Sequence, residues 1–218
     1  MKFLIIIPTH NEEKNILFCL ESLKKQTFRD YKIVVVNDGS TDQTQTIVNE
    51  FAAAHPDFEI ENLEKSEHQP GAKVVRTFNK GLEMVDLKDF DIICKFDADI
   101  IFPVNYLKKI HDVYEKNPKA GMVSGIVKIK KSVFENKLAF DFRDEKKQWV
   151  FENISSKNHV RGPIKSYRKE CFLEMNGLRP VLGWDNMSVM SRLHHRWSVL
   201  APTHTRMKNL HPTHNKKK

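Results

Sequence analysis

The chain has 218 residues, of which 40% are hydrophobic and 29% are charged. This composition excludes a fibrous or wholly disordered architecture, and the length suits a single domain with a substantial core. The formal charge of +8 would suit nucleic acid, anionic lipid or a phosphate-bearing substrate, and charge alone does not choose among them. Residues 214–218, which end in three lysines, are predicted to form a basic disordered tail.

The cysteines and the N-terminal residues argue against a secreted or membrane-spanning chain. Cys19, Cys94 and Cys171 are widely spaced among apolar neighbours, which disfavours a disulfide framework or a Cys-rich zinc site. The first apolar run, residues 3–8, is too short for a signal peptide or a membrane span and predicts a buried strand. We therefore expect a cytoplasmic protein.

Short apolar runs alternate with helical patterns through the first 129 residues, which is typical of βαβ units and a mainly parallel sheet. Strands are predicted at residues 3–7, 32–36, 58–62, 91–96 and 122–129. Apolar residues at helical spacing predict four intervening helices: Ile16, Leu17, Leu20 and Leu23; Ile47, Val48 and Phe51; Val74, Val75, Phe78 and Leu82; Tyr106, Leu107, Ile110, Val113 and Tyr114.

The remaining third of the chain is less regular. Residues 130–159 show no clear periodicity, which predicts a long loop or hairpin excursion that carries binding contacts. A short helix is predicted at residues 168–176, a turn at 177–183 and a second helix at 185–195. The aromatic side chains of Trp149, Phe151 and Trp184 are candidates for stacking on a sugar, although core packing explains such residues as well.

Polar segments follow the first two predicted strands, where a doubly wound sheet places its ligands. The first contains Pro8, Thr9, Asn11 and Glu12, and either Thr9 or Asn11 is suited to capping the next helix, whose free N–H groups face an anion. The second contains Asp38, whose carboxylate on a glycine turn can accept hydrogen bonds from a ribose or a base. A plain helix cap and a plain Asp-Gly turn remain the structural alternatives.

Two carboxylates follow the fourth predicted strand. Asp97, Ala98 and Asp99 form an Asp-x-Asp triplet at its end, and oxygen donors of this kind suit Mg²⁺ or Mn²⁺. Such a triplet also arises by chance in an acidic-rich chain, but like charges at the end of a buried strand need a counter-ion. A further carboxylate, Asp185, opens a predicted helix behind Trp184, where helix capping is the alternative.

Together these segments resemble the family 2 glycosyltransferases, from Phe3 to about Thr213. The resemblance implies a single-domain GT-A fold, a Rossmann-like, mainly parallel sheet flanked by helices. It divides the catalytic domain, residues 1–213, into a nucleotide-sugar-binding half at 1–120 and an acceptor-side half at 121–213. It also implies inverting transfer of a sugar from a nucleoside diphosphate to a saccharide or lipid-linked acceptor hydroxyl.

The resemblance assigns roles to individual residues. Asp38 would accept the base N–H of a uridine-like donor, Asp99 would bind the metal directly, and Asp185 would be the catalytic base. The expected nucleotide-sugar-binding residues are Pro8, Thr9, Asn11, Glu12, Asp38, Arg76, Asp97 and Ala98. Arg76 belongs to a glycine, arginine and asparagine segment at residues 71–81, for which a basic solvated helix face is an equally good interpretation.

The C-terminal motif departs from the family pattern of His-Leu-Arg or His-Leu-Lys before Pro-Thr. Asn209 occupies the place of the expected histidine, and His211 takes the basic position. His211 is the candidate metal ligand from this segment, although histidines near a chain end are often simply exposed. The cofactor expected is Mn²⁺ or Mg²⁺.

Several functions remain open at this point. A UDP-sugar is the favoured donor and no nucleic acid is expected, since basic residues are dispersed and no base-reading motif occurs. A sugar nucleotidyltransferase would need a glycine-rich basic loop after the first strand, which residues 8–13 lack. A non-catalytic nucleotide-sugar-binding relative is the other alternative. Peripheral contact with the cytoplasmic face of a membrane would depend on the basic surface and weaken with salt.

Overall fold

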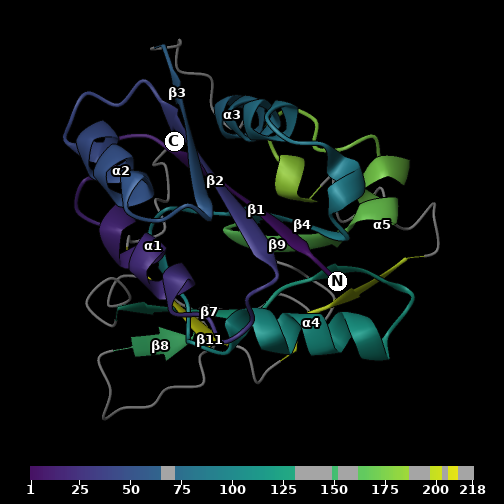
Figure 1. Cartoon of the computed structure of the whole chain (residues 1–218). Coiled ribbons are helices and arrows are strands. Elements are labelled where there is room, and N and C mark those ends of the chain that lie inside the picture. The colour runs from purple at the N-terminus through teal and green to yellow at the C-terminus, as the bar shows by residue number, and fades with distance from the viewer. Residues whose placement is uncertain (65–71, 131–148, 152–161, 187–196, 203–205, 211–218) are drawn as a thin grey trace.

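A computed structural model describes residues 1–64, 72–130, 149–151, 162–186, 197–202 and 206–210 (Figure 1). The helices and strands of these ranges are β1 (Phe3–Thr9), α1 (Ile16–Lys24), β2 (Tyr31–Asp38), α2 (Thr44–Ala53), β3 (Phe58–Leu63), α3 (Ala72–Glu83), the 3-10 helix η1 (Leu87–Asp89), β4 (Ile92–Phe96), β5 (Ile100–Ile101), α4 (Tyr106–Lys116), β6 (Ala120–Val123), β7 (Ile126–Lys130), β8 (Trp149–Phe151), β9 (Ile164–Arg168), α5 (Lys169–Glu174), β10 (Ser198–Leu200) and β11 (Arg206–Asn209). Helices and strands alternate from β1 to β4, as the sequence predicted, whereas β5 follows β4 without an intervening helix.

The larger sheet has the strand order β10-β6-β9-β4-β1-β2-β3. Parallel pairs join β1 to β2, β1 to β4, β2 to β3 and β10 to β6, whereas β9 runs antiparallel between β4 and β6. Six of these seven strands therefore share one direction. The predicted single-domain α/β fold with a mainly parallel sheet is confirmed.

A smaller sheet, in the order β5-β11-β7-β8, corrects one prediction. Residues 122–129 are not one strand: β6 and β7 belong to different sheets, and the chain turns between them at Ser124 and Gly125. The buried Ser124 donates its backbone N–H to Leu200, at 3.1 Å. The hydrophobic run predicted strand structure correctly, but it does not show where a strand changes partners.

The predicted excursion at residues 130–159 is described only at its two flanks. Strands β7 and β8 pair antiparallel, with Lys130 opposite Trp149. Residues 131–148 and 152–161 lie outside the described residues, as do 187–196 of the predicted helix 185–195, of which Trp184, Asp185 and Asn186 are helical. The tail at 214–218 also lies outside them.

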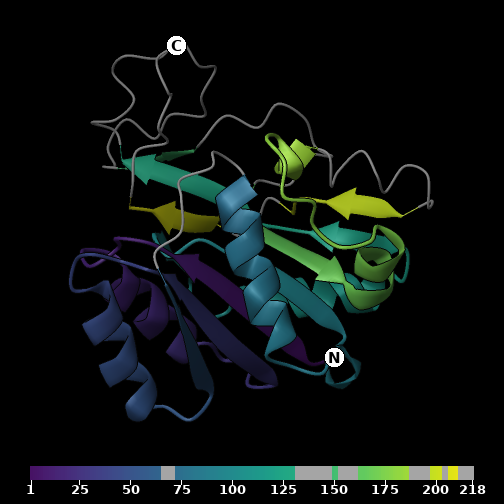
Figure 2. The same ribbon diagram turned by 90° about the horizontal axis from the view of Figure 1, so that it is seen from above.

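Helices cover both faces of the larger sheet, because successive strand residues point to opposite sides. In β1, Phe3, Ile5 and Ile7 pack with α1, α2 and α4, while Leu4 and Ile6 pack with α3 and α5. Figures 1 and 2 show α3 on the opposite side of the sheet from α1 and α2. Both faces are buried, as expected for parallel strands that read as continuous apolar runs.

One residue of the predicted helix faces is misplaced. Leu17 is exposed, whereas Ile16, Cys19, Leu20 and Leu23 form the buried side of α1. These four positions follow the helical spacing of three and four residues, and Leu17 lies about 100° away around the helix. The apolar residue Leu17 was therefore assigned to the wrong face.

Helix α3 approaches the sheet closely at Gly81. A Cβ atom built on Gly81 would lie 2.7 Å from Ile6 Cγ2 and 3.0 Å from Val36 Cγ2. Real Cβ atoms do not approach other carbons this closely, so a side chain at this position would push the helix away from β1 and β2. The glycine allows α3 to lie directly on the two strands whose ends carry the polar loops.

The three cysteines are buried and free, as their wide spacing among apolar neighbours predicted. Helix α5, at Lys169–Glu174, confirms the short helix predicted around residues 168–176. Among the described helices, none combines the length and the apolar character that crossing a membrane requires.

Candidate functional site

The polar segments meet at one edge of the larger sheet. The chain adds β2 and β3 on one side of β1 and then returns to add β4 on the other side. Such a reversal of strand order opens a crevice beyond the carboxyl ends of the strands, where α/β folds bind ligands. Thr9, Asp38 and Phe96 end these three parallel strands, so the loops that follow them lie at the edge where such a crevice is expected.

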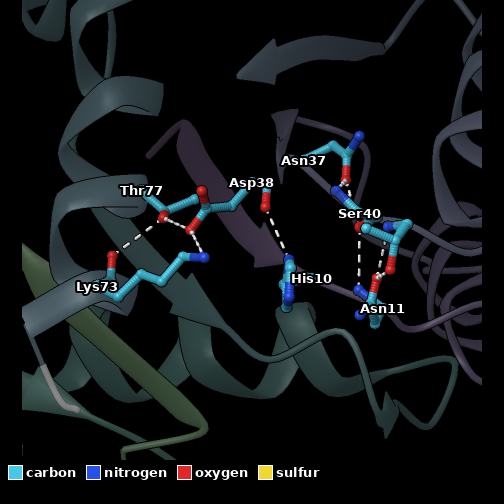
Figure 3. Close-up of polar contacts among 8 residues, drawn as sticks. His10, Asn11, Asn37, Asp38, Ser40, Lys73 and Thr77 are labelled. Atoms are coloured by element: carbon cyan, nitrogen blue, oxygen red, sulfur yellow. Dashed lines mark hydrogen bonds and ion pairs between the residues drawn. The ribbon is translucent and has the colours of Figure 1, made fainter. Parts of the chain in front are cut away.

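The loops after β1 and β2 are joined through Asn11 and Ser40. The backbone N–H of Asn11 donates to Ser40 Oγ at 2.9 Å, and Asn11 Oδ1 accepts from the backbone N–H of Thr41 at 2.8 Å (Figure 3). Asn37 Oδ1 in turn accepts from Ser40 Oγ at 2.6 Å. Asn11 has φ of 53°, a left-handed conformation that asparagine tolerates better than most residues.

The carboxylates of Asp42 and Glu13 form further hydrogen bonds between the loops after β1 and β2. Asp42 accepts hydrogen bonds from the backbone N–H groups of Glu13 and Thr44, at 3.2 and 3.0 Å. Glu13 Oε2 accepts from the backbone N–H of Gln43 at 3.1 Å, and Thr44 Oγ1 accepts from the backbone N–H of Glu12 at 2.7 Å. Each loop thus supplies acceptors for N–H groups of the other, and these hydrogen bonds hold the two loops together.

Asp38 is the centre of the candidate base pocket. Its carboxylate is buried and accepts a hydrogen bond from Thr77 Oγ1 at 2.9 Å, with Lys73 Nζ at 3.4 Å (Figure 3). The Asp38 carbonyl lies 2.7 Å from His10 Nδ1. Because a carbonyl oxygen only accepts, His10 carries a proton on Nδ1.

Helix α3 supplies the partners of Asp38 from a stripe that the sequence did not single out. Lys73 and Thr77 are four residues apart and so project from the same side of the helix. Arg76, the residue predicted from the resemblance, is exposed. In the sequence, the apolar Val75 and Phe78 are three residues apart, and Lys73 and Thr77 are four residues apart. These two spacings were the available signal for which side of α3 meets β2.

The two carboxylates of the Asp-x-Asp triplet have different surroundings. Asp97 is partly exposed and forms an ion pair with the ammonium group of Lys95. Asp99 is buried, and its Oδ1 has no hydrogen-bond partner among the residues that the structure describes. Burial, together with the negative charges of Asp97 and Glu12, raises the pKa of Asp99 to about 8.

These features fit a divalent cation at Asp99. A cation would provide a partner for Oδ1 and would offset the repulsion among Asp97, Asp99 and Glu12. Within the described ranges, no three side chains of His, Cys, Asp or Glu come together as a metal site. This is compatible with Mg²⁺ or Mn²⁺ sites of nucleotide enzymes, in which one or two carboxylates act together with waters and substrate phosphates.

The C-terminal strand brings a further segment to Asp99. Strand β11 pairs antiparallel with β5, with Asn209 opposite Ile100, and the backbone N–H of Leu210 donates to the Asp99 carbonyl at 2.9 Å. The predicted ligand His211 is the next residue and lies outside the described residues. Within the described residues, the C-terminal segment thus reaches Asp99 at Leu210.

Asp185 lies near the Asp-x-Asp triplet through the segment before β9. The Asp97 backbone N–H donates to the Pro163 carbonyl at 2.8 Å. A Cβ atom built on the adjacent Gly162 would lie 3.5 Å from Asp185 Cβ and 3.6 Å from its Oδ2. Asp185 itself is half-buried. The structure thus gathers Asp185 with the loop that holds Asp97, although the two lie far apart in the sequence.

Three further residues of this region had been missed or assigned only a general role. Lys95 and Lys165 are buried lysines within strands β4 and β9, and both ammonium groups face the Trp184 ring, at 5.2 and 5.3 Å from its centroid. In β4 the signal in the sequence was a lysine inside an otherwise apolar strand, since lysine is almost never fully buried without partners. Strand β9 also contains Ser166 and Arg168, so its sequence contained no such signal for Lys165.

Comparisons with known proteins identify the family and the fold. The family model described as glycosyl transferase family 2 matches residues 4–173. A glucuronosyltransferase of Methanococcus voltae that acts on dolichyl N-acetyl-α-D-glucosaminyl phosphate is 34% identical over 129 residues, covering 56% of this chain and 38% of that protein. The poly-β-1,6-N-acetyl-D-glucosamine synthase of Staphylococcus epidermidis is 26% identical over 125 residues, covering 57% of this chain and 28% of that protein.

Solved structures show the same fold. A mannosyltransferase from Pyrobaculum calidifontis in complex with GDP-Man and Mn²⁺ superposes with a TM-score of 0.70 at 17% identity, covering 98% of this chain and 58% of that one. The S. aureus enzyme TarS, residues 1–349 with UDP-GlcNAc, gives 0.65 at 22% identity, covering 98% and 60%. The chain thus spans less than two thirds of these relatives. The fold is of the GT-A type, and the chain belongs to glycosyl transferase family 2.

Proposed function

We propose that the chain transfers a sugar from a UDP-sugar to a hydroxyl of a saccharide or lipid-linked acceptor, with inversion at the anomeric carbon. The observation that carries the proposal is the buried Asp99, whose Oδ1 lacks a partner among the described residues at the carboxyl edge of the sheet. A buried acceptor that the chain leaves unsatisfied is costly and indicates a missing ligand. The family to which the chain belongs supports the same chemistry.

The donor would occupy the nucleotide-sugar-binding half, residues 1–120. The Asp38 carboxylate, which accepts a hydrogen bond from Thr77 and lies near Lys73, would accept the imide N–H of uracil. The loop containing Pro8, Thr9, Asn11 and Glu12 would form the wall beside the nucleoside. The similar S. aureus structure contains UDP-GlcNAc, and the P. calidifontis structure contains GDP-Man, so a UDP donor is the favoured but not the sole candidate for this pocket.

Asp99 would hold Mn²⁺ or Mg²⁺, with His211 as a candidate second ligand and Asp97 and Ala98 lining the donor. When bound, the cation supplies electrostatic stabilisation for the negative charge that develops on the departing diphosphate. The P. calidifontis structure contains Mn²⁺. Lys95 forms its ion pair with Asp97, and its charge lowers the pKa of Asp99 less than burial and the charges of Asp97 and Glu12 raise it.

Asp185 would act as the catalytic base from the acceptor-side half, residues 121–213. An attacking hydroxyl must lose its proton, and a positioned carboxylate accelerates such a step by roughly a hundredfold to ten-thousandfold. Asp185 is half-buried beside Gly162, and the hydrogen bond between Asp97 and Pro163 ties that segment to the donor side. In an inverting reaction the acceptor hydroxyl, deprotonated by Asp185, would attack from the side opposite the diphosphate.

A lipid-linked acceptor would bring the chain to a membrane surface. The M. voltae relative is named for a dolichyl phosphate acceptor, and the formal charge of this chain is +8. We propose peripheral contact at the cytoplasmic face through basic side chains, which predicts cosedimentation with anionic vesicles that weakens as salt is raised.

The proposal is tested by titrating UDP, GDP and TDP into the protein by calorimetry, with and without Mn²⁺. Wild type is expected to bind UDP more tightly when Mn²⁺ is present, and Asp99→Asn is expected to lose this gain. Asp57→Asn, which changes an exposed aspartate, is the matched control. No binding of any of the three nucleotides would contradict the donor pocket. Binding without turnover of any UDP-sugar would favour a non-catalytic relative.

A further inference from the structure

Two lysines lie opposite each other in the interior of the protein. Lys95 of β4 and Lys165 of β9 are direct partners in an antiparallel pair, so their side chains project from the same face of the sheet. Lys165 is 0% exposed and Lys95 is 3% exposed. Like charges opposite each other in a sheet are destabilising, and burial adds a desolvation cost. The arrangement reduces stability and requires compensating contacts.

The contacts that compensate for burying Lys95 and Lys165 connect both lysines to residues of the candidate site. Lys95 forms an ion pair with Asp97, the first residue of the Asp-x-Asp triplet. Lys165 donates a hydrogen bond to the backbone carbonyl of Asp185, the candidate base. Both ammonium groups face the indole ring of Trp184 at cation–π distance. Trp184 precedes Asp185 directly, so its ring and the Asp185 carbonyl are held by the same lysine.

We propose that Lys165 is a positioning residue, which together with Trp184 and Lys95 fixes the backbone of Asp185 relative to Asp97. The proposal rests on the proposed function for the role of Asp185. Lys165 is fully buried and so acts through Asp185 without touching the sugar. Lys95, its partner in the sheet, forms an ion pair with Asp97. The two paired lysines thus connect the donor-side carboxylate, Asp97, to the acceptor-side carboxylate, Asp185.

The register of β9 explains why the side chain of Lys165 reaches the backbone carbonyl of Asp185. Asp97 follows β4 directly, and Pro163 precedes β9 directly, with the Asp97 N–H bonded to the Pro163 carbonyl. Lys165 is therefore two residues inside the antiparallel strand, at the same depth as Lys95. From this depth its ammonium group reaches the Asp185 carbonyl, while the Asp185 side chain packs beside Gly162.

Two substitutions at Lys165 distinguish positioning from simple packing. Lys165→Met keeps the length and the apolar stem but cannot donate to Asp185, whereas Lys165→Gln is neutral but keeps an N–H donor. If Lys165 only fills space, Met should perform at least as well as Gln. If it positions Asp185, kcat for UDP-sugar hydrolysis should fall about ten- to a hundredfold in Met and less in Gln. UDP affinity should change less than about twofold in both, because the Asp38 pocket is unaltered.

Lys169→Met is the matched control, since Lys169 also lies near a backbone carbonyl, 3.4 Å from Lys88 O, but away from the site. It should leave kcat unchanged. Thermal unfolding of each variant checks that it is folded.

A second measurement does not depend on turnover. Hydrogen exchange of the peptide that contains residues 181–186 should be faster in Lys165→Met than in wild type and near wild type in Lys165→Gln. Equal exchange and equal kcat in Met and Gln would overturn the inference. Absence of turnover in wild type, with the predicted exchange pattern present, would instead contradict the proposed function and leave the structural role of Lys165 supported.

Discussion

Replacing Asp99 by asparagine should stabilise the metal-free protein in alkaline buffer. Burial, together with the charges of Asp97 and Glu12, raises the pKa of the Asp99 carboxyl from 3.8 to about 8. Between these two pH values the folded chain keeps a proton on Asp99 that the unfolded chain has released. The folded state therefore binds more protons, and its stability falls as the pH rises through this window.

The size of the effect follows from the same pKa. Each pH unit within the window lowers the free energy of unfolding by about 1.4 kcal/mol. The full cost is on the order of 5 kcal/mol once the pH exceeds about 8, which is comparable to the net stability of many domains. An asparagine side chain at this position would carry no charge at any of these pH values, so Asp99→Asn should escape this part of the pH dependence.

The assay is urea unfolding in EDTA, followed by circular dichroism from pH 5 to pH 9 for wild type and Asp99→Asn. The stability difference in favour of the variant should widen by about 4 kcal/mol between pH 5 and pH 8. Saturating Mn²⁺ should stabilise wild type selectively and narrow that difference. The Asp57→Asn control should track wild type. A difference between Asp99→Asn and wild type that stays constant with pH would refute the reasoning.

Three further predictions concern the donor side of the site. Thr77→Val removes the hydrogen bond to Asp38 and should weaken UDP binding about five- to tenfold by calorimetry, with no loss of unfolding midpoint beyond a few degrees. Gly81→Ala introduces the contact with Ile6 and should lower the free energy of unfolding in urea by about 1–2 kcal/mol, after the better helix propensity of alanine is allowed for; an unchanged midpoint would contradict the close approach. Asp42→Ala removes two acceptors at the loop junction and should cost about 1–2 kcal/mol in the same assay, whereas equal stability would show that water replaces them.

The sequence was sufficient to predict the elements that follow from local patterns. The apolar runs at β1, β2 and β4 are buried on both faces, and this makes them visible as continuous hydrophobic segments. The loops that carry Asp38, Asp97 and Asp99 follow such strands directly, so their common position at one sheet edge could be inferred from the topology of parallel sheets.

Pairing between distant segments was not accessible in the same way. The insertion of β9 between β4 and β6, the separation of β6 from β7, and the pairing of β11 with β5 depend on hydrogen bonds across long sequence distances. No spacing of residues in one segment specifies the partner of a strand. The predicted strand at residues 122–129 was wrong for this reason.

Contacts between side chains of distant segments could not be predicted from the sequence either. The resemblance assigns Arg76 to the donor, which stays a prediction, and no pattern indicated that Thr77, one residue later on the helix, donates a hydrogen bond to Asp38. A shift of one residue rotates a side chain by about 100°, so the choice depends on which side of α3 meets the sheet. Similarly, Lys165 became a candidate only when its register with Lys95 was seen.

The close approach at Gly81 affects which sequence changes this helix can tolerate. Lys73, Thr77 and Gly81 are spaced four residues apart along one side of α3, so the height of the helix above β1 and β2 also sets the reach of Thr77 to Asp38. A larger residue at position 81 would need a smaller one beneath it. A suppressor of Gly81→Ala should therefore be found in the strands, with Ile6→Ala, which removes both Ile6 Cγ2 and Ile6 Cγ1, as the first to try.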